Sequence, residues 1–254
     1  MLKYTINIFF LLCATLAFAQ DNGIAADTAT AKPVYYQKYG LRVGVDLSKP
    51  LRTLLEDNYE GLEIVGDFRL SQKMYLAAEL GTEKKGTEED NFMFTTTGSY
   101  IKAGVDWNTY ENWYGMHNII SLGLRGGFST FSQTLDAYRI YTTDQYWNEN
   151  VDGFPGEQYL GEYDGLTAQW AEVVVGVKVE LFNNLYLGGS VRLNYLINDT
   201  ASDVLPNMYI PGFNKVTDES RFGVGYNYTL SYLIPIFKTT NKKKATEEEA
   251  ETEE

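Results

Sequence analysis

Residues 171–181 read AEVVVGVKVEL, and this stretch decides the fold. Its odd positions hold alanine, valine and leucine, whereas Glu172, Lys178 and Glu180 occupy even positions. Side chains along a β-strand point to opposite faces in turn. The stretch therefore predicts a strand with one apolar face and one ionic face.

Seven further segments alternate in the same way, and the polar faces taken together carry both signs of charge. These segments are residues 40–48, 61–70, 74–82, 98–107, 117–129, 185–197 and 221–236. Eight such segments predict an all-β fold, an eight-stranded antiparallel up-and-down transmembrane β-barrel. In this arrangement the apolar faces meet lipid and the charged faces line the interior.

The connections between these segments alternate in length, which is typical of transmembrane barrels with short periplasmic turns and long extracellular loops. The short connections are 71–73, 109–116 and 182–184, and the long ones are 49–59, 83–97, 130–165 and 198–220. Since both chain ends then lie on the side of the short turns, the number of strands must be even, as eight is.

A soluble barrel of the lipocalin type would instead place the apolar faces inside. Three features favour the membrane version. The segments reach the 9–11 residues that a tilted strand needs to cross a bilayer, and the apolar faces are almost free of charge. Aromatic residues of these faces also cluster near segment ends, as in the interfacial girdles of membrane barrels: Phe68, Trp107, Phe128, Tyr195, Phe222 and Tyr232.

The polar faces together form a lumenal charge ladder whose signs nearly balance. Its members are Arg42, Asp46, Glu63, Asp67, Arg69, Glu79, Lys102, Asp106, Arg125, Glu172, Lys178, Glu180 and Arg192. Lone buried charges are costly, and side chains fill the interior of an eight-stranded barrel. The ladder is therefore interpreted as a solid ionic core, and a narrow pore or proton path is the alternative.

The chain ends predict export to the bacterial outer membrane. Lys3, an apolar run at 6–17 and the tripeptide AFA at 17–19 are typical of a signal peptide that is cleaved after Ala19. The expected parts are a signal peptide (1–19), a flexible leader (20–39), the barrel (40–237) and a disordered charged tail (238–254). Cleavage removes Cys13, the one cysteine of the chain, which excludes disulfides and thiol catalysis in the mature protein.

The sequence favours no enzymatic site, no metal and no cofactor. The net charge of −13 argues against nucleic acid, which needs a basic surface. His117 is the one histidine and the only candidate general base; Ser121 follows it, but no matched acid is evident. A lipid-modifying outer-membrane enzyme therefore stays a remote alternative.

The long loops are the expected place of any specific function. Loop 130–165 carries aromatics that either recognise an extracellular ligand or partner protein, or pack on one another to close the barrel: Tyr138, Tyr141, Tyr146, Trp147, Phe154, Tyr159 and Tyr163. The aromatic turn 209–214 is expected to dock on the same cap. Two tripeptides of the form Asp-Thr-Ala, at 27–29 and 199–201, match an O-glycosylation sequon.

Three segments carry a family resemblance: GLRVGVD at 40–46, FNNLYLG at 182–188 and GVGYNY at 223–228. They resemble an outer-membrane β-barrel family built on a domain of unknown function, and more broadly the small OmpA- and OmpX-type barrels. The resemblance implies fold and location but assigns no ligand. The leading hypothesis is a non-enzymatic barrel that anchors the envelope and displays recognition loops, with membrane lipid and the barrel-assembly machinery as partners. A narrow channel or transport accessory is the alternative.

Overall fold

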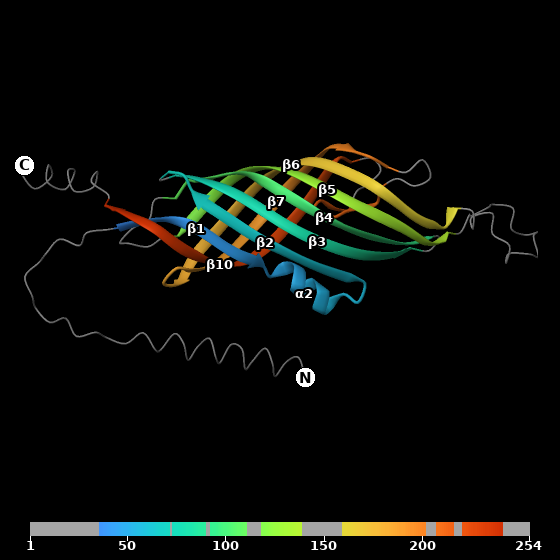
Figure 1. Ribbon diagram of the computed structural model, residues 1–254, viewed down its shortest axis with the longest axis horizontal. Helices are drawn as coiled ribbons and strands as arrows, with labels where there is room; N and C mark the ends of the chain where they lie inside the picture. Colours follow the sequence, from blue (N-terminus) through green and yellow to red (C-terminus); the bar gives the residue numbers. More distant parts are fainter. Residues whose placement is uncertain are drawn as a thin grey trace, which may run out of the picture. The chain divides into compact units, whose positions relative to one another are not determined.

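Eight strands close into an antiparallel barrel in the order β1, β10, β7, β6, β5, β4, β3 and β2 (Figure 1). The computed structural model describes residues 36–71, 73–89, 92–110, 118–138, 159–201, 207–215 and 220–240. The barrel strands are β1 (Tyr36–Asp46), β2 (Tyr59–Arg69), β3 (Met74–Glu89), β4 (Phe92–Asn108), β5 (Ile119–Tyr138), β6 (Gly161–Phe182), β7 (Leu185–Asp199) and β10 (Phe222–Thr240). The predicted all-β barrel of eight antiparallel strands is confirmed.

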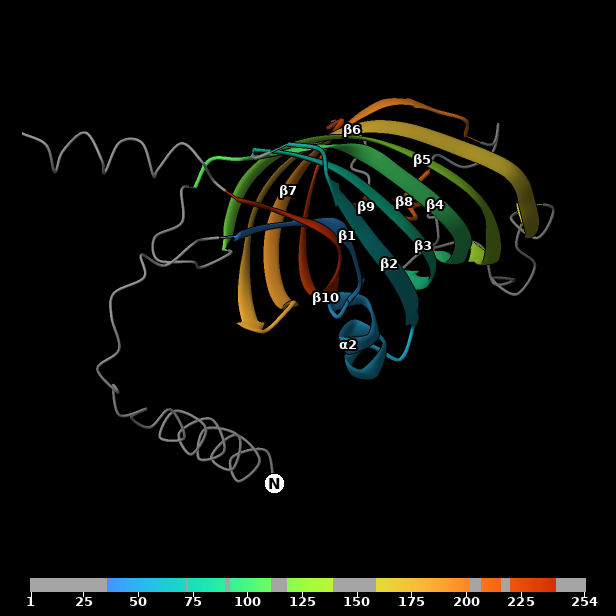
Figure 2. The same cartoon turned by 60° about the vertical axis from the view of Figure 1, so that its left-hand side comes forward.

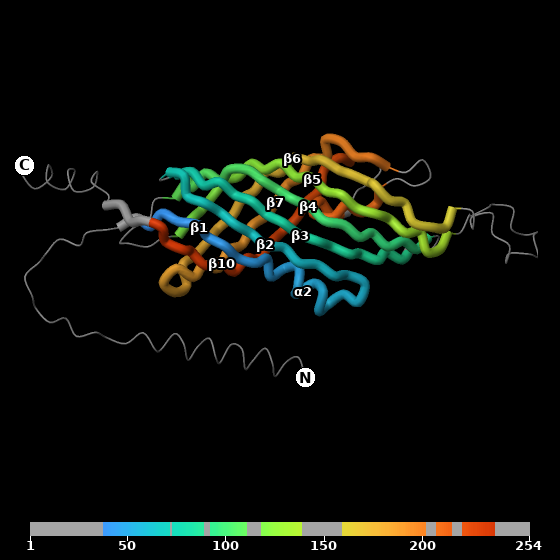
Figure 3. The backbone as a smooth tube through the Cα atoms, viewed as in Figure 1, coloured from blue at the N-terminus to red at the C-terminus, as the bar shows by residue number. Residues whose placement is uncertain are grey.

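The two ends of the barrel differ. At one end, here the turn end, the chain enters β1 and leaves β10, and short connections join β2 to β3 and β6 to β7 (Figure 3). At the other, the loop end, the strands extend further and the long connections begin. The alternation of residue types explains the faces: along β5, buried and exposed residues alternate from Ile119 to Phe131 without a break.

Four strands, β3, β4, β5 and β6, extend at the loop end well beyond their predicted ends, and β2 and β7 extend only slightly. Within the predicted loop 83–97, β3 continues to Glu89 and β4 begins at Phe92, and these two residues pair. β5 continues to Tyr138 and β6 begins at Gly161. In β5 and β6 the charge pattern stops short of the extensions because inward positions there, such as Phe131 and Leu166, are apolar.

Two further elements lie inside the predicted loops. Residues 49–59, predicted to be a loop, contain most of a helix, α2 (Ser48–Leu55). The loop between β7 and β10 forms the two-residue strands β8 (Tyr209–Ile210) and β9 (Asn214–Lys215), seen within the ring of strands in Figure 2. No helix in the described ranges is long and apolar enough to cross a membrane.

The barrel also extends past its predicted limits at the turn end. β1 begins at Tyr36, inside the range assigned to the leader, and β10 continues to Thr240, inside the range assigned to the tail. The signal peptide, the rest of the leader and the remaining tail lie outside the described residues.

Candidate functional site

All members of the charge ladder lie on the inner face of the barrel. Arg69, Lys178 and Glu180 are half-buried and the other ladder residues are buried. Near the turn end, Asp67 accepts hydrogen bonds from the Arg42 guanidinium (2.9 Å) and from Lys178 Nζ (2.6 Å), so one carboxylate joins β1, β2 and β6.

The middle of the lumen is organised around Glu79. This carboxylate pairs with Arg125, with Arg192 (2.5 Å) and with Lys102 (3.8 Å), which come from β5, β7 and β4. Arg125 also pairs with Asp106 at 3.0 Å. Because each ion has at least one opposite partner, the network compensates the cost of burying charge.

A second acidic centre, Glu172, lies beside this network. It pairs with Lys102 Nζ at 3.2 Å and with Arg192 at 3.3 Å, and it accepts a hydrogen bond of 2.7 Å from Trp170 Nε1. Arg192 therefore bridges Glu79 and Glu172. The ladder brings together residues that are far apart in the sequence.

Towards the loop end, polar side chains without charge join the carboxylates. The amide of Asn227 donates to both Asp46 and Glu63, and the Tyr100 hydroxyl donates to Glu63 at 2.6 Å. Asp46 also accepts from the backbone N–H of Ser48 at 2.9 Å, at the start of α2. The lumen and the β1–β2 connection are thus one hydrogen-bonded unit.

Sequence reasoning missed one buried ion pair, between Lys49 and Glu83. Both residues fall in ranges predicted as loops, yet the Glu83 side chain is fully buried and Lys49 reaches it from α2. One signal could have identified Glu83. Tyr75, Ala77 and Glu79 are inward positions of the same strand, and every second residue after them leads to Glu83. No such pattern marks Lys49.

The segment 207–215, here the plug, fills the lumen at the loop end. Oε2 of Glu83 accepts hydrogen bonds from the Tyr209 hydroxyl (2.7 Å) and the Gly212 backbone N–H (3.2 Å). Burial is the main cause that raises the pKa of Tyr209, and the negative charge of Glu83 raises it further. The phenol therefore stays protonated and donates its hydrogen bond. Gly212 has a φ of +82°, and a Cβ there would lie 2.6 Å from a Tyr100 ring carbon.

The plug carries its own apolar core into the barrel. Ile210 and Phe213 are fully buried, and the ring of Phe213 meets Trp170 edge-on with centroids 6.0 Å apart. The cluster around them combines the plug with four strands: Tyr100, Phe131, Leu166, Ala168, Trp170, Leu196, Ile210 and Phe213. The lumen is thus ionic near the turn end and in its middle, and aromatic near the loop end. Residues 209–214 are expected from the sequence to dock on a cap formed by loop 130–165. In the structure they pack inside the barrel.

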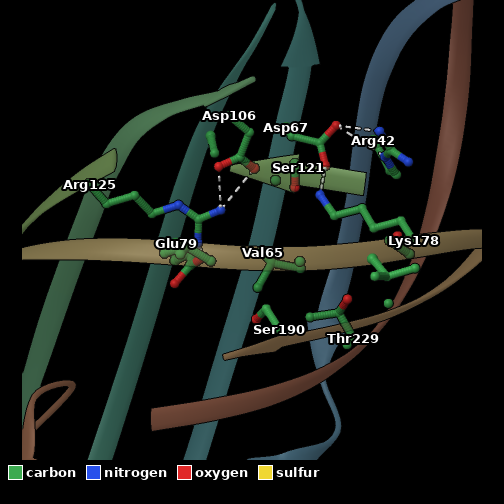
Figure 4. A pocket seen from close by; sticks show the side chains of 18 of the residues that line it. Arg42, Val65, Asp67, Glu79, Asp106, Ser121, Arg125, Lys178, Ser190 and Thr229 are labelled. Carbon is green, nitrogen blue, oxygen red and sulfur yellow. Dashed lines mark hydrogen bonds and ion pairs between the residues drawn. The ribbon is translucent and has the colours of Figure 1, made fainter. Parts of the chain in front are cut away.

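A small polar cavity of about 40 Å³ lies in the ionic part, between the Arg42–Asp67–Lys178 cluster and the side chains of Asp106 and Arg125 (Figure 4). Among the described residues, four of its lining side chains carry buried donors without a protein partner: Arg42 Nη1, Arg125 Nε, Arg192 Nε and Ser231 Oγ. Buried donors of this kind bind ordered water, for which about three molecules would fit.

The aromatic loop candidates are only partly described. Tyr138, Tyr159 and Tyr163 pack around a buried cluster of Phe94, Leu135 and Tyr209. The rings of Tyr138 and Tyr159 meet edge-on at 6.3 Å, and the Tyr163 hydroxyl donates to the Tyr159 carbonyl at 2.6 Å. These three side chains therefore pack against the barrel extension. The other candidates lie outside the described residues: Tyr141, Tyr146, Trp147 and Phe154.

The remaining candidates add no chemical site. His117 lies outside the described residues, and Ser121 is a buried residue on the cavity wall. In the described part of the chain, no group of three or more His, Cys, Asp or Glu is arranged to hold a metal ion. Thr200 of the second sequon is exposed, and its hydroxyl lies 3.1 Å from that of Thr167; the first sequon is not described.

Comparisons with known proteins give a family but no activity. Two solved structures are similar: Ail, the attachment invasion locus protein of Yersinia pestis (7% identity, TM-score 0.37, 77% of this chain and 97% of Ail), and Neisserial surface protein A (10% identity, TM-score 0.37, 78% and 95%). No curated protein sequence matches the chain. The family described as Domain of unknown function (DUF6048) matches residues 1–239, and the chain therefore belongs to this family.

Proposed function

We propose that this protein is a non-enzymatic barrel of the bacterial outer membrane, with a closed lumen and a surface that displays its loop-end extensions. The outward face carries the proposal. Its side chains are apolar and exposed on every strand, among them Val224 (73%), Val191 (64%) and Leu124 (61%). Monomeric soluble proteins rarely expose contiguous apolar patches of more than a few hundred Å², so lipid is the medium that suits this face.

Outward aromatic residues support the same conclusion. Trp107 and Tyr232 are exposed near the turn end, and Tyr195 and Phe222 pack together near the loop end with ring centroids 5.1 Å apart. Aromatic rings favour the two interfaces of a bilayer. Among the predicted girdle residues, Phe68 is half-buried.

The filled lumen favours anchoring and display over conduction. Paired ions occupy its middle and the plug occupies its loop end, and the cavity of about 40 Å³ lies among the ions on the side of the turn end. The β3–β4 and β5–β6 extensions would then carry the surface loops outward, where an extracellular ligand or partner protein could bind. Membrane lipid and the barrel-assembly machinery are the partners that this proposal requires.

Orientation in the membrane can be tested by labelling single cysteines on intact cells with a maleimide that does not cross membranes. In a Cys13→Ser background, Glu88→Cys lies on the loop-end extension and Asn183→Cys in a short turn; both positions are exposed. We expect Glu88→Cys to react on intact cells and Asn183→Cys to react only after permeabilisation. The reverse pattern, or equal labelling of both, would overturn the proposed display.

A narrow ion or proton path is a second candidate, and the cavity is the observation that favours it. Its unpartnered donors and its charged wall would solvate a chain of water molecules. Steady conductance in a planar bilayer that changes with Arg125→Gln or Glu172→Gln would select this candidate.

A further inference from the structure

Helix α2 presents its apolar face away from the protein. Leu47, Leu51, Leu54 and Leu55 recur at the spacing of one helical face, and the last two are 83% and 76% exposed. A helix on a water-soluble protein turns such a face towards the core. The reversed orientation here needs an apolar medium on the outside.

The polar face of α2 is fixed to the barrel by several contacts. Lys49 pairs with the buried Glu83 of β3, and the Arg52 guanidinium stacks over the Tyr59 ring of β2 at 4.1 Å. The backbone N–H of Gly61 donates to Thr53 Oγ1 at 3.1 Å. Because these contacts hold the polar side of the helix against β2 and β3, the helix cannot turn its leucines inward without breaking the contacts.

The depth of α2 follows from the strand register. β1 ends at Asp46, which pairs with Thr229 of β10, and Leu47 adds one more backbone hydrogen bond of 2.6 Å to Tyr228. The first part of β10, residues 222–228, lies nearer the loop end and has no β1 residues paired beside it. There α2 lies between β10 and β2 (Figure 1). The outward residues of this part of β10 are apolar or aromatic and exposed: Phe222, Val224, Tyr226 and Tyr228.

We propose that α2 is an interfacial helix, with Leu51, Leu54 and Leu55 inserted among the acyl chains of the outer leaflet. The inference rests on the proposed membrane barrel and extends its lipid contact beyond the strands. The outward row of β1, from Leu41 to Leu47, continues directly into the leucines of α2, so one apolar surface covers both elements. Helices of this type lie with their apolar face about 5–10 Å inside the headgroup boundary.

Quenching by brominated lipid tests this placement. Single cysteines in the full chain, with Cys13→Ser, are labelled with an environment-sensitive fluorophore and reconstituted in phosphatidylcholine vesicles with or without bromine on the acyl chains. Leu54→Cys and, independently, Leu55→Cys report on α2. Val191→Cys is the lipid control, since it faces outward and pairs with Tyr226, and Glu88→Cys is the water control. Each variant is first shown to be folded by its gel mobility without boiling.

We expect brominated lipid to reduce the Leu54 and Leu55 signals about twofold or more, as it does for Val191, and to leave Glu88 unchanged. Quenching at Val191 without quenching at Leu54 and Leu55 would overturn the helix placement and leave the membrane barrel intact. A blue-shifted but unquenched signal at Leu54 would assign the face to a second copy of the chain or another protein, which also overturns the inference. Absence of quenching at all three positions would overturn the membrane barrel itself.

Discussion

The Tyr209 hydroxyl donates a 2.7 Å hydrogen bond to Oε2 of Glu83, and this contact fixes a surface loop to the inside of the barrel. The same carboxylate pairs with Lys49 of α2. Glu83 thus connects the plug, the β3 wall and the β1–β2 connection at one buried point.

Tyr209→Phe is expected to destabilise the barrel by about 1.5–3 kcal/mol, because a buried carboxylate loses one charged hydrogen bond. Urea unfolding from lipid vesicles, followed by tryptophan fluorescence, measures this loss. The matched control is Tyr226→Phe, which removes a hydroxyl on the exposed outward face. Equal stability of the two variants would show that the hydrogen bond from Tyr209 to Glu83 does not stabilise the barrel.

Phe213→Ala is expected to cost about 3–5 kcal/mol, since it removes a fully buried ring from the plug core and leaves a cavity beside Trp170. Faster proteolysis near the plug in vesicles should accompany the loss. Phe222→Ala removes an outward ring and should leave the plug protected. An unchanged cleavage rate in Phe213→Ala would mean that the plug is not held by its aromatic contacts.

Glu79→Gln is expected to destabilise the barrel by about 3–5 kcal/mol, because Arg125, Arg192 and Lys102 lose the central partner they share. Glu56→Gln breaks only partly exposed pairs with Arg52 and Lys85 and should cost less than about 1 kcal/mol. Urea unfolding of both variants checks the contrast. Similar losses would show that the lumenal network does not stabilise the barrel.

The ion pairs of Glu56 with Arg52 and Lys85, at the C-terminal end of α2, should weaken in acid. The hydrogen bond from Arg52 lowers the pKa of Glu56, burial partly opposes this effect, and Lys85 adds to the lowering. A lowered folded pKa stabilises the helix above the ordinary carboxyl pKa, and this contribution is lost as the pH falls through the folded value. Because the Glu56 side chain is more than a third exposed, solvent screens its pairs and the loss stays below about 1 kcal/mol. After the intrinsic pH dependence of amide exchange is divided out, the protection of the α2 amides should fall in acid relative to neutral pH, and it should fall more in the native chain than in Glu56→Gln.

The sequence predicts the two faces well because a strand has a strict period of two. Arg125 and Glu172 therefore fall inward on alternation alone. The same signal fails where the inward residues are apolar, as at Leu166 and Trp170, since the polar face that marked the strand disappears there. The extension of β6 to Gly161 is consequently missed.

The plug and α2 depend on contacts between distant segments. Residues 209–214 are recognisable as an aromatic turn, but their place inside the lumen depends on Glu83 and Tyr100, which are more than 100 residues earlier. α2 is only eight residues long, with Pro50 in its first turn. Its pairing with Glu83 is a tertiary contact that no local pattern reports.

Planar-bilayer recording of the full chain tests the closed membrane barrel most directly. The same preparation must first show a folded band that migrates differently before and after boiling, which establishes that the barrel has formed. The account predicts no stepwise conductance above the lipid background, because the ionic network and the plug fill the lumen. Steady conductance steps from the folded protein would contradict it.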